Sequence, residues 1–170
     1  MKPGYVPSAG ELTAHVRTGV DGAIRWVDRT LASPGGDPEL WEQSSFYARM
    51  MLMRSLERGE LLGWVLQRDA LAEQDPTRAE RLRQASSYWD DARPSLSRAL
   101  DELYKSADMD PHTGPSRGII TSSRYRLDVA KGWLAALADG LAVNSLSRSA
   151  EVEVVVEKEA PETSYGLDRL

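Results

Sequence analysis

Apolar residues recur every three or four positions along most of the chain, the spacing that lines one face of an α-helix. In the first such segment, over 8–32, the apolar positions are Leu12, Val16, Val20, Ile24, Val27 and Leu31. The segment ends at 33–36 with the sequence Ser-Pro-Gly-Gly, which favours a turn. The pattern predicts a first helix over 8–32. A second line on it, His15, Gly19, Gly22 and Trp26, is either packed closely on a neighbour or forms a groove.

A second helix is predicted from about 38 to 73. Asp37, Pro38 and Glu39 combine an N-cap, a first-turn proline and a carboxylate that complements the helix dipole. Small and apolar residues share one side of this helix: Trp41, Ser45, Ala48, Leu52, Leu56, Gly59, Gly63, Leu66 and Ala70. Because glycine has no side chain, we expect another backbone to approach closely at Gly59 and Gly63.

A third helix is predicted over 77–107, after a second Asp-Pro start signal at Asp75. Its inner face consists of Leu82, Ala85, Trp89, Leu96, Leu100 and Leu103. Pro94 lies inside this segment, and a proline both lacks the amide donor and clashes with the preceding turn. We therefore expect a kink or a break at Arg93.

The segment 108–121 is rich in Pro and Gly, which predicts a long loop. Thr121, Ser122 or Ser123 then caps a fourth helix that runs to about 147. Between 129 and 143 only Lys131, Gly132, Asp139 and Gly140 are not apolar. A helix that is apolar on nearly all sides is usually buried on nearly all sides, so this helix is predicted to be the central element.

The pattern changes at the end of the chain, where β-branched residues alternate with Glu over 151–157. This predicts a strand with Val152, Val154 and Val156 on its apolar face, followed by an extended tail over 160–170. The strand pairs either inside the monomer, with 118–121 joined by 5–6, or with another chain. The predicted fold is mostly α: a compact bundle of about four helices over 1–149, then a C-terminal strand and arm over 150–170.

The amino-acid composition excludes several classes of function. The 170 residues include no cysteine, which excludes disulfides, thiolate zinc sites and cysteine nucleophiles. The net charge of −5 argues against a generally basic nucleic-acid binder, and no apolar stretch is long enough to cross a membrane. The expected location is the cytoplasm or a viral particle.

Residues suited to catalysis are sparse. His15 and His112 are the only histidines, and neither has the partners of a metal site or a serine triad. Phosphate-binding and dinucleotide-binding fingerprints are absent from the sequence. Glu57 and Glu60 form a carboxylate pair, but a magnesium site would need a second pair nearby. We expect no enzymatic activity, no metal and no cofactor.

Two groups of residues are candidates for binding. The first is a basic and hydroxyl-rich cluster that could bind phosphate or nucleic acid: Arg117, Ser122, Ser123, Arg124, Arg126 and Lys131. Its alternative role is local ion pairing, such as Arg124 with Asp128. The second is Met50, Met51 and Met53, which either fill the core or form an interface.

The leading functional prediction is a non-catalytic structural subunit of a larger intracellular or viral assembly. It would associate with a protein partner or with its own copies through apolar helix faces and the C-terminal strand arm. The alternative is a small helical subunit that binds nucleic acid or phosphate through the cluster between Arg117 and Lys131. A third possibility is a helical enzyme or ligand-binding bundle that uses the carboxylates.

Overall fold

Four helices make up the described part of the protein. The computed structural model describes residues 4–33 and 37–158, with side chains as far as Leu146. The helices are α1 (Ala9–Leu31), α2 (Pro38–Ala72), α3 (Pro76–Ser106) and α4 (Gly114–Lys158). They confirm the predicted mostly helical bundle, and the bounds of the first three agree with the predicted ones within two residues.

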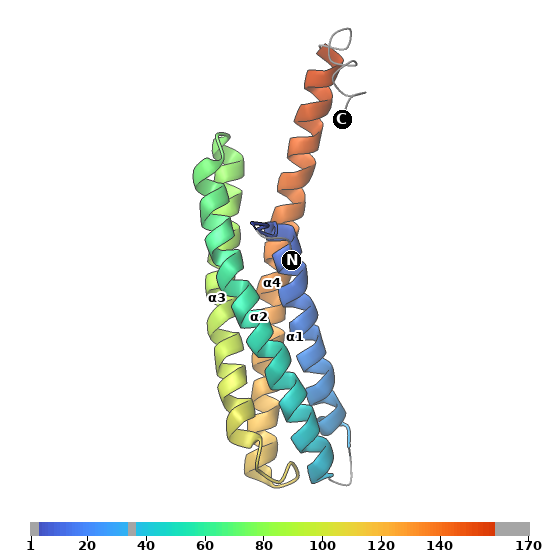
Figure 1. Ribbon diagram of the computed structural model, residues 1–170. Coiled ribbons are helices and arrows are strands. Elements are labelled where there is room, and N and C mark those ends of the chain that lie inside the picture. The colour runs from blue at the N-terminus through green and yellow to red at the C-terminus, as the bar shows by residue number, and fades with distance from the viewer. Residues whose placement is uncertain (1–3, 34–36, 159–170) are drawn as a thin grey trace.

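The helices form a ring in which each element packs against the next and α4 closes against α1 (Figure 1). Within the described residues, the helices that face each other across the ring make no backbone contact. The apolar stripes of all four helices meet in the middle as one hydrophobic core. Short connections between consecutive helices make neighbours antiparallel, as in other four-helix bundles.

Side chains cap the first three helices at their N-termini. Ser8 accepts a hydrogen bond from the Glu11 amide at 3.1 Å. Asp37 accepts from the Glu39 amide at 3.0 Å, and Asp75 from the Arg78 amide at 2.9 Å. These bonds satisfy amide groups that the helix itself leaves free, and they confirm the predicted starts of α2 and α3.

The two glycines of α2, Gly59 and Gly63, pack against the indole ring of Trp89 and not, as the sequence had predicted, against another backbone. A Cβ atom on Gly59 would lie 1.9 Å from Cη2 of Trp89, and one on Gly63 would lie 3.1 Å from its Cδ1. On α1, a Cβ atom on Gly19 would lie 2.0 Å from Oγ of Ser55. The glycine line of α1 is therefore packed against α2, as the close-packing interpretation predicted.

The break expected at Arg93 does not occur, because α3 continues through Pro94. Pro94 is exposed, and so is Asp90, whose carbonyl loses its helical donor. Water can bond to that carbonyl, while buried Ala92 and Leu96 hold the helix on the core. The orientation of the proline thus decides whether it interrupts the helix.

The start of the fourth helix was predicted too late. α4 begins at Gly114, and its first backbone bond joins the Arg117 amide to the Thr113 carbonyl at 2.9 Å. Pro115 fits the first turn, where a missing amide donor has no cost. Thr121, Ser122 and Ser123 therefore lie inside the helix and cap nothing.

The prediction that the fourth helix is central and buried on nearly all sides was wrong. Among the described helices, α4 packs against its two neighbours in the ring, α1 and α3, and not against α2. One side of it is buried through Ile120, Leu127, Ala130, Leu134 and Leu137. Its exposed apolar side chains include Tyr125, Val143 and Leu146, whereas Leu141 packs against the core and Trp133 stacks on Tyr88 of α3.

The C-terminal strand is not confirmed. The backbone continues as α4 to Lys158, through the positions assigned to the strand. Residues 118–121, the proposed internal pairing segment, are also helical, and residues 5–6 form no strand, so the described structure shows no internal partner for the predicted strand. The side chains of Val152, Val154 and Val156 and the predicted tail over 160–170 lie outside the described part.

Candidate functional site

The basic residues on one side of α4 hold it to α1. Arg117 donates from Nη2 to the carbonyl of Leu31, the last residue of α1, at 3.1 Å. Arg124 donates from Nε to Oδ1 of Asp28 at 2.7 Å. Lys131 pairs with Asp21, with Nζ 3.3 Å from Oδ1. The seven-residue spacing of these three cations keeps them on the α1 side of α4.

The other members of the cluster point elsewhere. Ser122 donates to Oε1 of Glu102 on α3 at 2.9 Å, and Arg126 donates from Nε to the same oxygen at 2.8 Å. Ser123 is buried and donates to the carbonyl of Ile120 at 2.8 Å. The cluster is therefore divided between two seams of the bundle, and Ser123 is inaccessible to a ligand.

Ion pairing compensates the charge of Arg124. Besides Asp28, it bonds to Asp128 at 2.5 Å, the pair named above as the alternative to anion binding. Burial lowers the pKa of Arg124, but its hydrogen bonds to the two carboxylates outweigh burial and leave the pKa raised. Binding of an anion at this cluster stays a prediction, and it would have to compete with these intramolecular partners.

The methionines of α2 divide between core and surface. Met51 is half-buried and packs on Gly22, where a Cβ atom would lie 2.4 Å from the Met51 sulfur. Met50 and Met53 are exposed, and the Tyr104 hydroxyl lies 3.4 Å from the sulfur of Met53. Core filling thus applies to Met51, and an interface role is open only to the other two.

Met50 and Met53 belong to a longer apolar surface that we call the outer α2 face. Its members are Phe46 (50% exposed), Met50 (36%), Met53 (44%), Trp64 (56%) and Leu71 (89%). Steps that follow the helical period place all five opposite the side of α2 that faces the core. Sequence reasoning missed Trp64 and Leu71, although they continue the same periodic series.

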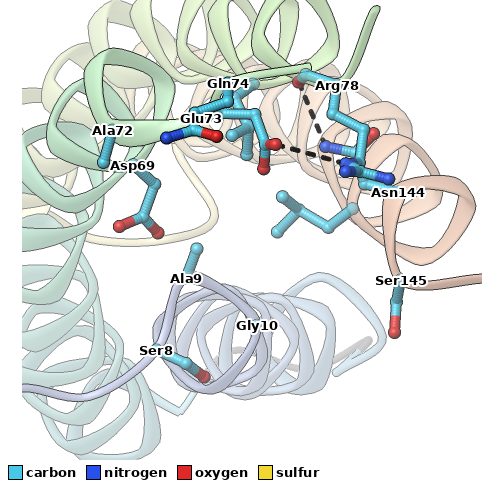
Figure 2. Close-up of a pocket in the computed structure, with 12 residues that line it drawn as sticks. Ser8, Ala9, Gly10, Asp69, Ala72, Glu73, Gln74, Arg78, Asn144 and Ser145 are labelled. Carbon is cyan, nitrogen blue, oxygen red and sulfur yellow. Dashed lines mark hydrogen bonds and ion pairs between the residues drawn. The ribbon is translucent and has the colours of Figure 1, made fainter. Parts of the chain in front are cut away.

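A cleft of about 720 Å³ lies at the end of the bundle where α1 begins (Figure 2). Its walls combine side chains from all four helices: Ser8, Ala9, Gly10, Asp69, Ala72, Glu73, Gln74, Arg78, Leu82, Leu141, Asn144 and Ser145. Nothing in the sequence pattern indicated this cleft, because its residues converge only when α1 and α3 start beside the same part of α4.

The polar groups of the cleft are largely engaged with one another. Arg78 pairs with Glu73, with Nε 3.3 Å from Oε1, and both side chains are mostly buried. Asn144 donates from Nδ2 to the Arg78 carbonyl at 3.2 Å (Figure 2). The buried Oδ1 of Asn144 has no hydrogen-bond partner among the described residues. The cleft can therefore offer one acceptor to a small donor such as water.

Over the ranges that the structure describes, no group of three or more His, Asp or Glu side chains is placed to hold a metal ion. Likewise, no described helix is both long enough and apolar enough to cross a membrane. Comparisons with protein-family models, with curated proteins and with solved structures find no match for this chain.

Proposed function

We propose that this chain is a non-catalytic interaction subunit that docks on a larger assembly through the outer α2 face. The observation that supports this most directly is the exposure of Phe46, Met50, Met53, Trp64 and Leu71 along one side of one helix. The core is closed without them, since α2 presents a second, fully buried stripe to α1 and α3.

Burial of the outer α2 face against a partner would lower the free energy of the complex. Full burial of one large apolar side chain contributes about 1.5–3 kcal/mol, so five of them can drive an association. Grouped exposed apolar side chains are typical of interaction sites, and here Phe46, Met50 and Met53 form one group that Glu57 separates from Trp64 and Leu71. Phe, Met and Trp are also enriched in interfaces.

The residue types point to docking and not to chemistry. Phe, Met, Trp and Leu provide contact area but no acid, base or nucleophile. The face also has polar neighbours of the kind found at an interface rim, because Glu57 interrupts it and Arg68 lies 5.4 Å from the ring centre of Trp64. The nucleic-acid alternative has less support, since its cations are paired within the chain.

The test is a purification of the tagged chain from its native source under mild conditions. We expect a stoichiometric protein partner with the wild type, and loss of that partner with the double variant Met50→Glu, Trp64→Glu. A control variant, Gln84→Glu, Ser87→Glu, alters an exposed side of α3 and should retain the partner. Circular dichroism should show equal helicity for all three.

Recovery of the chain without any partner, or a partner retained by the α2 variant, would contradict the proposal. Both substituted positions are exposed, so an effect on folding is not expected to confuse the result.

A further inference from the structure

α4 extends beyond the helices that support it. Asn144 bonds to the carbonyl of Arg78, three residues into α3, and Ser145 shares a cleft with Gly10 at the start of α1. Past about residue 146, α4 therefore has neither neighbour beside it, and Figure 1 shows it standing clear of the bundle. We call residues 147–158 the overhang; at 1.5 Å per residue it is about 18 Å long.

Such a segment gains little stability by itself. Most helical stability in proteins comes from packing of an amphipathic face, and the overhang has no neighbouring helix to pack against. The sequence here also includes four valines, whose branched side chains lower helix propensity. Another molecule that packs along the overhang would supply the contacts that stabilise its helical conformation.

The side of α4 that faces away from the core offers a surface for that molecule. This outer α4 face consists of Tyr125, Val129, Gly132, Ala136, Gly140 and Val143, and the exposed carboxylates Asp128 and Asp139 border it on one side. Tyr125 is 68% exposed and Val143 is 46% exposed. A Cβ atom on Gly132 or Gly140 would meet no atom within 4 Å. These two glycines cost the helix about 1 kcal/mol each relative to alanine, and no packing inside the chain requires them.

The outer α4 face is symmetric about one residue. Ala136 has a glycine four positions before and after it, and a valine seven positions before and after it. Ala136 also stands 22 residues from either end of α4. A two-fold interface requires a surface that is complementary to itself, and two antiparallel copies of this helix meet that requirement.

We propose that a second copy of this chain packs antiparallel along α4, with the two Ala136 residues at the two-fold axis. In this register the overhang of each copy lies along residues 114–125 of the other. Gly132 of one copy meets Gly140 of the other, which allows the two backbones to approach closely. A crossing angle near 20° keeps the helices together over their whole length.

Formal charge is complementary in the same register. Within 114–125, the charge of Arg124 is balanced by Asp28 and Asp128, whereas Arg117 donates to a carbonyl and keeps its positive charge. The overhang carries Glu151, Glu153 and Glu157 against Arg148 and Lys158, so its net formal charge is opposite to that of Arg117. Antiparallel packing also places the C-terminus of one helix dipole beside the N-terminus of the other.

The first test is the mass in solution by size-exclusion chromatography with light scattering. We expect a dimer, twice the 18.8 kDa of the chain. Ala136→Arg places two like charges at the axis and should raise the dimer dissociation constant about 100-fold or more. Ser87→Arg, an exposed position on α3, should leave the dimer unchanged. A monomeric wild type, or a dimer that survives Ala136→Arg, would overturn the proposal.

The second test fixes the register, and it uses the absence of cysteine from the sequence. Under mild oxidation, Ala136→Cys should cross-link with itself. Gly132→Cys should cross-link poorly alone and efficiently when mixed with Gly140→Cys, since these positions meet across the axis. Self-cross-linking of Gly132→Cys that exceeds the mixed reaction would indicate parallel helices and contradict the proposal.

This dimer is independent of the outer α2 face. If Met50→Glu, Trp64→Glu dissociates the dimer while Ala136→Arg does not, the second copy docks on α2 and the α4 proposal is wrong. If the α2 variant loses its partner but remains dimeric, both proposals stand.

Discussion

At the scale of single residues, glycines in this protein have two different roles. Gly59 has no room for a side chain, because the ring of Trp89 occupies the space where a Cβ atom would be. Gly118 lies on the exposed side of α4, where a Cβ atom would meet nothing within 4 Å. The same substitution should therefore have opposite effects at the two positions.

We predict that Gly59→Ala lowers the free energy of unfolding by about 1–2 kcal/mol, because overpacking against Trp89 outweighs the gain in helix propensity. In the isolated chain, Gly118→Ala should raise it by about 0.5–1 kcal/mol, through helix propensity alone. Urea unfolding followed by circular dichroism measures both. A shift of both variants in the same direction would show that the ring does not constrain Gly59.

At the scale of helices, the start of α3 depends on one carboxylate. Asp75 accepts a hydrogen bond from the Arg78 amide, and this bond is the main reason that the pKa of Asp75 lies below 3.8. The folded pKa is thus lower than the unfolded one. The stabilisation is fully present above about pH 4 and disappears as the pH falls through the folded pKa.

We predict that Asp75→Ala lowers the midpoint of thermal unfolding by about 2–4 °C at pH 7, because the first turn of α3 loses its cap. Asparagine caps helices as well as aspartate, so Asp75→Asn should retain the stability at pH 7. Its stability should also fall less than that of the wild type between pH 5 and pH 2. Equal acid sensitivity of the two proteins would rule out a role for this carboxylate.

At the scale of the whole molecule, polar contacts close the ring between the first and last helices. Arg117, Arg124 and Lys131 all bond from α4 to α1, and Arg124 has the smallest exposed fraction of its side chain among the paired cations of this seam. Because Asp28 and Asp128 both depend on Arg124, removing its charge leaves two carboxylates without their partner.

We predict that Arg124→Met lowers the free energy of unfolding by about 1 kcal/mol, measured with urea at low salt. Lys131→Met should cost less, since both members of that pair are about half-exposed. The effect of Arg124→Met should shrink in 1 M salt. The contrary result is an Arg124→Met variant that is as stable as the wild type but no longer binds a nucleic acid that the wild type binds. In that case the main role of the basic cluster is nucleic-acid binding and not ion pairing.

Local patterns in the sequence were sufficient for the bundle itself. The apolar periods, the Asp-Pro starts and the turn at 33–36 depend on residues within a few positions of each other, so the first three helices could be predicted closely. The tight packing around Gly19 was predictable for the same reason, because a line of small residues on one helix face is visible in the sequence.

Only the tertiary structure determined which side of each helix faces the core and which side faces solvent. Pro94 does not break α3 because it happens to face solvent, and α4 is half-exposed because only two neighbours cover it. The basic cluster is divided because its carboxylate partners lie on α1 and α3, at sequence distances of 24 residues for Arg126 and 96 for Arg124. Periodicity shows that a helix has an apolar side, but only packing determines which apolar side remains uncovered.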